Sequence, residues 1–365
     1  MPLKCLNNNQ PIYSFDFSED EWEALRKENK QTKCLETSCC NEKVVLKTSP
    51  LGTKYFAHVR KGECTTAPMT AEHILAQLHI IEGIKRTSWK FEAEANPEKC
   101  EITPTGREWQ ADVLATKNKH KIAFEVQWSN QSIKETLRRH KRYKDSNVRA
   151  LWFFKQTSFI VDKENPAFQI EFNETEKSFK VHLKPVQYWR DNRLRQPAIP
   201  LQDFVEGCLT GKLIFSPLIG KTVPLEVLTI NQQCKRCKKH TNIITGLKFL
   251  TSHTLHNDQD LHASIHTAGI EPYLLEWLPA GLLKAHIIGK LKVRKSFMAV
   301  EKEASYFSNG CHHCDGIQPR YYEDKSMETG EPLIILNILF TKELADIFYQ
   351  GHINYWWFDT SKTTS

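Results

Sequence analysis

The segment 109–127, WQADVLATKNKHKIAFEVQ, constrains the fold of this chain most strongly, because it predicts a β-hairpin with two different faces. Side chains alternate along a strand. One face of the second strand carries the apolar side chains of Ile122, Phe124 and Val126. That face belongs in a core. The opposite face carries Glu125 and Gln127, and the preceding strand adds Asp112, so this otherwise apolar hairpin presents two acids and an amide.

These polar side chains have a direct chemical interpretation. Asp112 and Glu125 can converge on a divalent ion such as Mg²⁺, which takes carboxylate oxygens and leaves positions for water and a substrate phosphate. Gln127 cannot act as a base, but it can orient an attacking water or contact the phosphate. The alternative is that the acids lie on a solvated sheet face. The apolar strand expected at 148–154 and the basic helix near 130–145 favour a sheet covered on both faces, and therefore a site.

The order of the predicted elements indicates an α/β fold. Residues 70–86 form an amphipathic helix that begins after Thr70 as N-cap. The hairpin, the basic helix and the strand VRALWFF at 148–154 follow, which gives the order helix, strand, strand, helix, strand. This order is typical of a compact core with a mixed sheet.

The chain divides into four blocks by composition: 1–66, 67–160, 161–222 and 223–365. The first is expected to hold short strands between cysteine-bearing turns, and its Asn, Pro, Gly and Ser content indicates loops rather than helices. A helix is expected at 201–213. Near the end of the chain, EPLIILNILF predicts a strand and TKELADIFYQ a helix.

Length and charge leave the class of partner open but favour an anionic one. With 365 residues the chain is long enough for two or three domains. Lys and Arg number 50 against 43 Asp and Glu, a net charge of +7, and the segment 134–149 concentrates the positive charge directly after the hairpin. No signal peptide or membrane span is evident, so we expect a cytoplasmic protein. Eleven cysteines in that compartment point to metal rather than disulfides.

Several stretches in a fixed order resemble the competence protein CoiA-like nucleases. They are AEH at 71–73, WQADVL at 109–114, IAFEVQWSNQSIKETLRRHKRY at 122–143 and VRALWFF at 148–154. YFAH at 55–58 and LQDFVEGCLTGKL at 201–213 extend the resemblance from about residue 34 to about residue 215. These nucleases are a branch of the PD-(D/E)XK superfamily. The resemblance implies a restriction-endonuclease-like mixed sheet flanked by helices, with an N-terminal zinc-binding element.

The resemblance also implies roles for individual residues. Asp112 and Glu125 match the metal ligands, and Gln127 occupies the position of the lysine in the superfamily's name. Glu72 matches an acid that many superfamily members place near the same metal, although a first-turn acid also serves as a helix-capping group. His73 fits the helix pattern of the family, whereas Gln77 stands where relatives often carry lysine. Residues that match the family's Ser, Glu, Arg and Tyr series are Ser129, Ser132, Glu135, Arg138 and Tyr143.

The helix after the hairpin is a candidate DNA-binding element. Its basic side chains are Arg138, Arg139, Lys141 and Arg142. Arg and Lys make most protein contacts to the nucleic-acid backbone, so a basic helix beside a phosphodiester-cleaving site suits phosphate binding. The alternative is an ordinary solvated charged face.

Two groups of cysteines are candidate Zn²⁺ sites. In the first block the ligands are expected to be Cys34, Cys39 or Cys40, His58 and Cys64. The alternative for this block is buried cysteines without a metal. In the last block Cys234-x-x-Cys237 and Cys311-x-x-Cys314 predict a four-thiolate site in a zinc-ribbon-like domain, with a structural or a DNA-contacting role. The 73 residues between the two pairs form an insertion, unless the pairs never meet.

Two functions of different classes follow. The first is a Mg²⁺- or Mn²⁺-dependent deoxyribonuclease, CoiA-like, that acts in DNA uptake, recombination or defence. The second is a zinc-containing DNA-binding protein that keeps a nuclease-like fold without cutting. Both take DNA as the partner and no membrane, and both leave open self-association or protein partners in a DNA-processing system. The joint presence of Asp112, Glu125 and Gln127 favours the nuclease.

Overall fold

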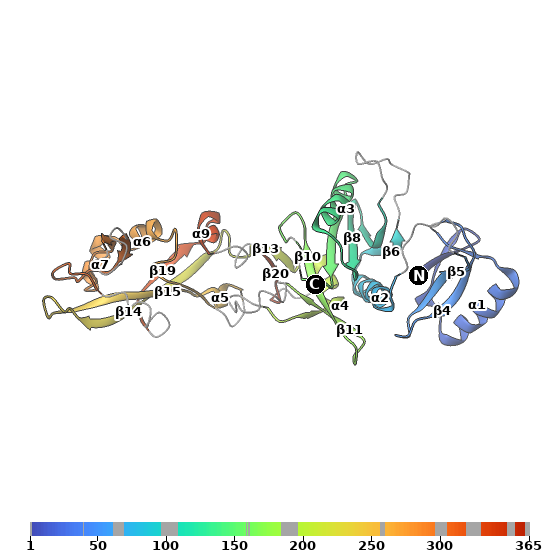
Figure 1. The fold of residues 1–365 in the computed structure, drawn as a ribbon, viewed down its shortest axis with the longest axis horizontal. Helices are drawn as coiled ribbons and strands as arrows, with labels where there is room; N and C mark the ends of the chain where they lie inside the picture. Colours follow the sequence, from blue (N-terminus) through green and yellow to red (C-terminus); the bar gives the residue numbers. More distant parts are fainter. Residues whose placement is uncertain are drawn as a thin grey trace.

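The computed structural model describes residues 2–38, 40–60, 69–95, 109–157, 159, 161–183, 196–255, 260–295, 305–318, 330–348 and 355–361. The molecule is elongated, with an N-terminal unit at one end, a sheet domain in the middle and a C-terminal unit at the other end (Figure 1). Within the described residues, none of the helices has the length and apolar character that crossing a membrane requires.

The N-terminal unit combines two small sheets with one helix. Its elements are β1 (Lys4–Asn7), β2 (Gln10–Tyr13), the 3-10 turn η1 (Ser14–Asp16), α1 (Glu19–Thr32), β3 (Leu35–Glu36), β4 (Val44–Thr48) and β5 (Lys54–His58). The predicted strands are present, but the expectation of loops rather than helices is wrong, because α1 packs Trp22 against Phe56 in the core of this unit. Ser18 and Glu21 form a capping box that begins the helix.

The middle of the molecule is a seven-stranded mixed sheet. Its strands are β6 (Lys90–Ala95), β7 (Ala111–Lys117), β8 (His120–Gln127), β9 (Arg149–Phe154), β10 (Ala167–Asn173), β11 (Ser178–His182) and β12 (Ile199–Pro200). They lie in the order β12-β11-β10-β9-β8-β7-β6. β9 pairs in parallel with β8 and with β10, and the remaining pairs are antiparallel. The sheet extends beyond residue 160, where the sequence indicates a boundary.

Helices cover both faces of this sheet. They are α2 (Ala71–Lys85), α3 (Ile133–Asp145) and α4 (Leu201–Leu209). α2 and α4 share a core with Phe124 and Phe153, while Tyr143 of α3 packs with Ala123 and Trp152. Alternate residues of β8 and β9 therefore enter different cores, as the strand period requires. The expected mixed α/β arrangement is present, with β6 as an additional edge strand that the sequence analysis did not include.

The C-terminal unit is built on two long antiparallel strands. Its elements are β14 (Thr222–Gln233), β15 (His240–Phe249), α5 (Thr251–Leu255), β16 (Leu261–Ala263), α6 (Glu271–Trp277), α7 (Ala280–Ala285), β17 (Lys292–Lys295), β18 (Ser305–Ser308), β19 (Glu331–Leu339) and α9 (Lys342–Ile347). Four strands form a sheet in the order β16-β15-β14-β19. The strand and the helix expected near the end of the chain correspond to β19 and α9.

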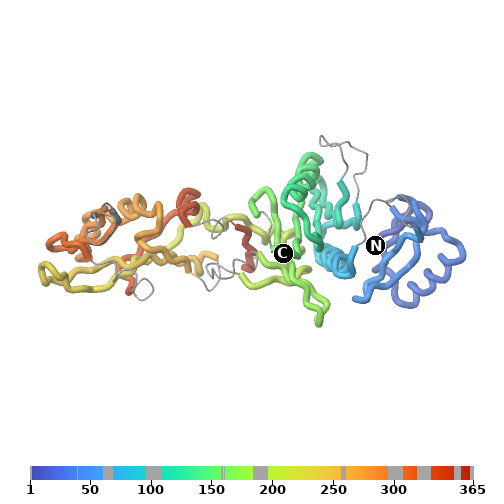
Figure 2. The backbone as a smooth tube through the Cα atoms, in the orientation of Figure 1, coloured from blue at the N-terminus to red at the C-terminus, as the bar shows by residue number. Residues whose placement is uncertain are grey.

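The chain returns to the sheet domain after this unit. β13 (Leu213–Phe215) leaves the sheet domain and pairs with β20 (Trp356–Phe358), which comes back to it. Phe358 packs on Phe204 of α4, with ring centroids 5.8 Å apart. A Cβ on Gly207 would lie 2.1 Å from the Phe358 ring, so only glycine admits this contact. Figure 2 shows the end of the chain beside the sheet domain.

Candidate functional site

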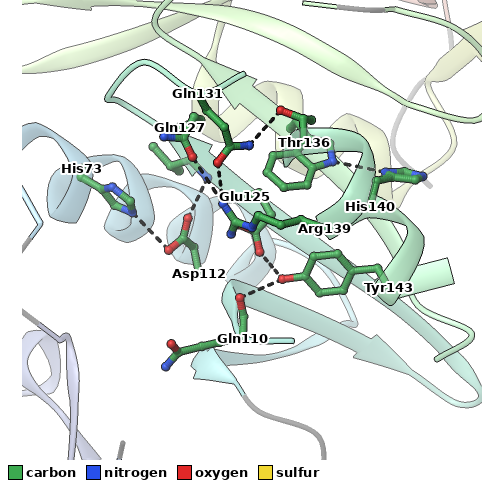
Figure 3. A network of polar contacts seen from close by, with 12 residues as sticks. His73, Gln110, Asp112, Glu125, Gln127, Gln131, Thr136, Arg139, His140 and Tyr143 are labelled. Carbon is green, nitrogen blue, oxygen red and sulfur yellow. Dashed lines mark hydrogen bonds and ion pairs between the residues drawn. The ribbon is translucent and has the colours of Figure 1, made fainter. Parts of the chain in front are cut away.

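Asp112 and Glu125 lie across from each other on neighbouring strands. The register that pairs Val113 with Phe124 places Asp112 of β7 opposite Glu125 of β8. Their side chains are 15% and 1% exposed. Figure 3 shows both carboxylates between α2 and α3, within one network of polar contacts. The structure therefore brings the two predicted acids together.

Asp112 is held by α2 and by the backbone of β8. Its Oδ1 lies 3.1 Å from His73 Nε2 and accepts a hydrogen bond of 3.0 Å from Gln77 Nε2. Its Oδ2 accepts a hydrogen bond of 2.8 Å from the Val126 backbone N–H. Burial opposes ionisation of Asp112, but the adjacent His73 and these hydrogen bonds hold its pKa below the usual value. Burial also opposes protonation of His73, yet Asp112 raises the pKa of this imidazole.

Glu125 is held by α3. Its Oε2 accepts a hydrogen bond from Arg139 Nη2, and its Oε1 lies within hydrogen-bond reach of the Tyr143 hydroxyl. The same hydroxyl lies 2.8 Å from the Gln110 carbonyl oxygen. The Tyr143 hydroxyl has one proton, so it donates to either Glu125 or the Gln110 carbonyl at any moment. Burial raises the pKa of Glu125 to about 7, and the charge of Asp112 adds to that increase.

Arg139 connects Glu125 to the amide groups around the site. Its Nη1 lies 3.3 Å from Gln127 Oε1 and 3.1 Å from Gln131 Oε1. Its guanidinium also lies over the Trp152 ring, 4.9 Å from the centroid. Gln127 in turn donates from Nε2 to the carbonyl oxygen and the hydroxyl of Ser129, at 2.9 and 3.0 Å. Gln127 is thus held beside the only cation in direct contact with Glu125 among the described residues.

The network borders a cavity of about 270 Å³. Its polar lining comes from His73, Glu94, Gln110, Asp112, Gln127 and Arg139. The cavity therefore has acidic, basic and amide groups around one space that is large enough for a phosphate group.

The chemistry of the donors fits a hard divalent cation. Asp112 and Glu125 supply carboxylate oxygens, which Mg²⁺ and Mn²⁺ prefer. Gln77 adds an amide whose Oε1 is buried and has no hydrogen-bond partner within the described residues. Its amide group already contacts Asp112, and rotation by half a turn exchanges its nitrogen and oxygen. A cation at Glu125 would compete with Arg139 for the same carboxylate.

Residues 70–189 match a family model described as competence protein CoiA, nuclease-like domain. This segment is similar to the nuclease-like domain of CoiA. The match begins at the N-cap of α2 and includes both acids of the site. Comparison with curated proteins gave no match.

Two α2 residues that the sequence analysis did not assign to the site contact Asp112 in this CoiA-like domain. The predicted acid of the helix, Glu72, is not among the described residues that line the cavity, whereas its neighbour His73 is. His73 and Gln77 instead contact Asp112, because residues four apart lie on one helix face. Glu72 and His73 differ by one position, so they point in different directions around the helix.

Glu94 is a third buried acid beside the cavity. It lies in β6 with a φ of 45°, in the left-handed region, and is 3% exposed. Its carboxylate accepts hydrogen bonds from the backbone N–H groups of Leu3 and Lys4, at 2.8 and 3.2 Å. Burial raises the pKa of Glu94 to about 7. This residue joins the N-terminal unit to the CoiA-like domain.

The four predicted DNA-binding residues of α3 have different surroundings. Arg138 is exposed and pairs with Glu135, at 2.7 Å, and Lys141 pairs with Asp145, at 2.9 Å. Arg139 lies in the site. Arg142 is 8% exposed. The helix therefore offers Arg138 and Lys141 to solvent, Arg139 to the cavity, and Arg142 to the protein interior.

The four predicted cysteines of the C-terminal unit come together. The Sγ atoms of Cys234, Cys237, Cys311 and Cys314 lie within 4.8 Å of one another. Cys234 and Cys314 are 3.7 Å apart at sulfur, and Cys237 and Cys311 are 3.6 Å apart. A tetrahedral zinc with Zn–S bonds of about 2.3 Å separates its sulfurs by ~3.8 Å. The group could therefore hold a structural metal such as zinc.

The cysteines of this cluster differ in pKa, and burial raises the pKa of the Cys311 thiol to about 12. Burial opposes ionisation of Cys234, but hydrogen bonds from the backbone of Cys237 and Arg236 lower the pKa of this thiol to about 6. A thiolate is the form that binds metal.

The N-terminal cysteine site is only partly within the described residues. Cys39 and Cys64 lie outside them. Cys40 Sγ is 3.3 Å from His58 Nε2, and Thr32 Oγ1 donates to Cys34 Sγ at 3.3 Å. In the described part of the chain, three or more metal-capable groups gather only at the C-terminal cysteines.

Proposed function

We propose that the CoiA-like domain is a Mg²⁺- or Mn²⁺-dependent deoxyribonuclease of the PD-(D/E)XK type. The observation that carries the proposal is the position of two acids that face each other across neighbouring strands, Asp112 in the lining of a cavity and Glu125 buried behind it. The nuclease-like family match of this segment supports the same reading.

In this proposal Asp112 and Glu125 hold the metal ion, and Glu72 is a third candidate ligand by resemblance alone. When bound, such an ion stabilises negative charge on the scissile phosphate as a Lewis acid. Gln127 orients the attacking water or contacts the phosphate. Arg139 brings a permanent positive charge to the cavity wall, which offsets the acids and attracts a phosphodiester.

DNA would approach along α3. Arg138 and Lys141 are exposed and engaged only in ion pairs within their own helix. Exposed pairs of this kind contribute little free energy, so a phosphate can compete for either cation. We assign Zn²⁺ to the four C-terminal cysteines and, with Cys39 or Cys40 as a ligand, to the N-terminal group of Cys34, His58 and Cys64. Both ions have a structural role.

A second candidate is DNA binding without cleavage. The observation in its favour is that Arg139 and Tyr143 already occupy both oxygens of Glu125. A carboxylate held in this way can serve the stability of the domain instead of binding a metal.

A cleavage assay distinguishes the two. Purified protein is incubated with single-stranded, duplex and branched DNA, with Mg²⁺, with Mn²⁺ or without added divalent metal. The nuclease proposal expects cleavage of at least one DNA form only when metal is added. Retention of DNA binding without cleavage of any form under either metal would support the second candidate.

A further inference from the structure

The two cysteine pairs are built on the same backbone turn. In the first, Lys238 N–H donates to the Cys234 carbonyl at 2.9 Å, and Cys234 N–H donates to the Lys239 carbonyl at 2.9 Å. In the second, Asp315 N–H donates to the Cys311 carbonyl at 2.9 Å, and Cys311 N–H donates to the Gly316 carbonyl at 2.8 Å. We call residues 234–240 the first knuckle and residues 311–316 the second knuckle.

Equivalent positions of the two knuckles carry opposite charges. Lys238 and Asp315 each follow the first cysteine of their pair by four residues, and both have left-handed backbone, with φ of 63° and 54°. Asn, Asp and Gly are the residues that ordinarily tolerate this region. Asp315 meets that preference, whereas Lys238 does not. A residue kept in an unfavourable backbone conformation is a reason to look for a function.

The first knuckle is a dense group of unpaired cations. Its exposed basic side chains are Lys235, Arg236, Lys238 and Lys239. Within the described part of the chain, none of these four side chains makes a hydrogen bond or an ion pair. Asp315, the acid of the neighbouring knuckle, is already neutralised by Lys292 and by Arg294, whose Nη2 lies 2.6 Å from its Oδ1. A Zn²⁺ ion held by four thiolates carries a net negative charge and offsets part of the repulsion among these cations. The remaining positive charge favours binding of an external anion.

The four cations lie on an open surface at the end of the C-terminal unit, where a polyanion can reach them. Lys235 and Arg236 border an open cavity of about 340 Å³ beside the cysteine cluster. The turn between β14 and β15 lies at the end of the C-terminal unit that points away from the sheet domain (Figures 1 and 2). The cysteine cluster fixes the position of the knuckle, so the four charges are carried by a rigid turn.

We propose that the first knuckle is a second DNA-binding surface, which holds the phosphate backbone of duplex DNA at the end of the molecule opposite the N-terminal unit. Neither knuckle carries Phe, Tyr or Trp, whereas the first has four exposed cations, so contacts to phosphates are favoured over stacking on unpaired bases. Phosphate contacts by lysine and arginine need no base information. The proposal shares its DNA partner with the proposed function but does not depend on cleavage.

The test compares two variants that remove the same number of charges. The knuckle variant combines Lys235→Gln, Arg236→Gln, Lys238→Asn and Lys239→Gln, with asparagine chosen because it tolerates left-handed backbone. The control variant combines Lys27→Gln, Lys30→Gln, Lys163→Gln and Lys284→Gln, four exposed lysines elsewhere on the surface. Both carry Asp112→Asn so that DNA is not consumed. Binding to a fluorescent duplex of about 60 base pairs, ~200 Å long, is measured at several salt concentrations.

The knuckle variant is expected to bind this duplex at least about tenfold more weakly than the control variant, with the slope of log Kd against log salt smaller by about 3. Equal affinity and equal slope in two folded proteins with the same zinc content would overturn the proposal. Loss of binding to phosphatidylserine vesicles, with duplex binding unchanged, would overturn it as well. Should the knuckle variant lose zinc, the pair Lys235→Gln and Arg236→Gln gives the same comparison with a smaller effect, since neither residue has left-handed backbone.

Binding of DNA and cleavage of DNA separate this inference from the proposed function. A protein that binds duplex through the knuckle but never cleaves would retain the inference and lose the nuclease assignment. If the wild-type protein cleaves DNA and the knuckle variant binds duplex as tightly as the control variant, the nuclease assignment is retained and the inference about the knuckle is lost.

Discussion

At the scale of single residues, the buried pair of Glu125 and Arg139 determines both stability and chemistry. Arg139 makes its ion pair with a carboxylate that is 1% exposed. Removing one partner of a buried pair leaves an uncompensated group in the interior. Arg139→Met is therefore expected to destabilise the domain by about 3 kcal/mol. Glu125→Gln is expected to have a smaller effect, because a carboxyl with a pKa of about 7 is already half protonated near neutrality.

Urea unfolding of the two variants and of the wild-type protein checks this prediction. Arg138→Met is the matched control, since its arginine is exposed on the same helix. An Arg139→Met variant as stable as this control would mean that the ion pair contributes nothing to the fold.

Glu94 predicts a pH dependence of stability. Its pKa is about 7 in the folded protein against 4.5 for an ordinary glutamate, because burial disfavours the charged form. Between these values the folded state keeps a proton that the unfolded state has lost, so stability is highest at low pH and falls as the pH rises towards 7. The full difference is on the order of 3 kcal/mol.

Glu94→Gln should remove the part of this dependence that comes from Glu94, while Glu125, whose pKa burial also raises to about 7, keeps its own part. Unfolding free energies of the wild-type protein and the variant, measured at about pH 5 and about pH 7.5, provide the comparison. If both proteins lose the same stability over this interval, Glu94 is not the group responsible.

The sequence was sufficient for the residues that follow a regular period. Asp112, Glu125 and Gln127 were predicted from strand alternation and from the resemblance. In the structure Asp112 and Gln127 line one cavity, and Glu125 is bound to Arg139 in its wall. His73 and Gln77 could have been found from their spacing of four on a helix that begins at the resemblance. Glu94 could not, because its left-handed backbone interrupts the alternation of β6 and its partners Leu3 and Lys4 are 91 and 90 residues away.

At the scale of elements, the sequence predicted some helices and strands correctly and failed to predict others. The hairpin of β7 and β8, and β9, were predicted because their hydrophobic patterns are clear. The helix α2 was predicted from its N-cap and apolar spacing, but it is buried on most sides and is not the amphipathic helix that was expected. The helix α1 was not predicted, because the turn-forming residues around it indicate loops, although Ser18 and Glu21 form a capping box. The cysteine pairs predicted two knuckles, but only the fold shows that they meet across the intervening residues.

The cysteine clusters predict two zinc ions per chain. Elemental analysis of the purified protein is expected to find both. Cys237→Ser is expected to remove the C-terminal ion, and Cys34→Ser the N-terminal one. Cys208→Ser is the control, because Cys208 lies in α4 away from both groups. A content of less than one zinc would contradict both sites, and an unchanged content in Cys237→Ser would contradict the C-terminal one.

At the scale of the whole molecule, the C-terminal unit is an insertion between two strands that pair with each other. Composition indicated a boundary near residue 223 but gave no sign that β20 returns to β13 and α4. Sequence patterns report local periods, whereas this return depends on a contact between residues more than 140 positions apart. The boundary predicted at residue 160 also divides one sheet, because the sheet continues through β10, β11 and β12. Local sequence patterns do not show that these strands join the strands before residue 160.

Phe358 is expected to stabilise the sheet domain although it lies near the end of the sequence. Its ring is 6% exposed and packs against Phe204 and over Gly207. Phe358→Ala should destabilise the domain by about 3 kcal/mol through loss of buried area and the cavity that remains. Hydrogen exchange in α4 should accelerate in this variant and not in Ser361→Ala. Unchanged exchange would show that the returning strand does not support the sheet domain.

The central claim is that Asp112 and Glu125 form a metal-dependent nuclease site. The most direct measurement is the rate of Mg²⁺- or Mn²⁺-dependent DNA cleavage by the wild-type protein, Asp112→Asn, Glu125→Gln and the control Glu174→Gln, whose side chain is exposed in the turn between β10 and β11. Each site variant is expected to lose at least about a hundredfold in rate, because each removes a charged oxygen ligand of the same ion, while the control keeps wild-type activity. Near wild-type cleavage by folded Asp112→Asn or Glu125→Gln would contradict the account.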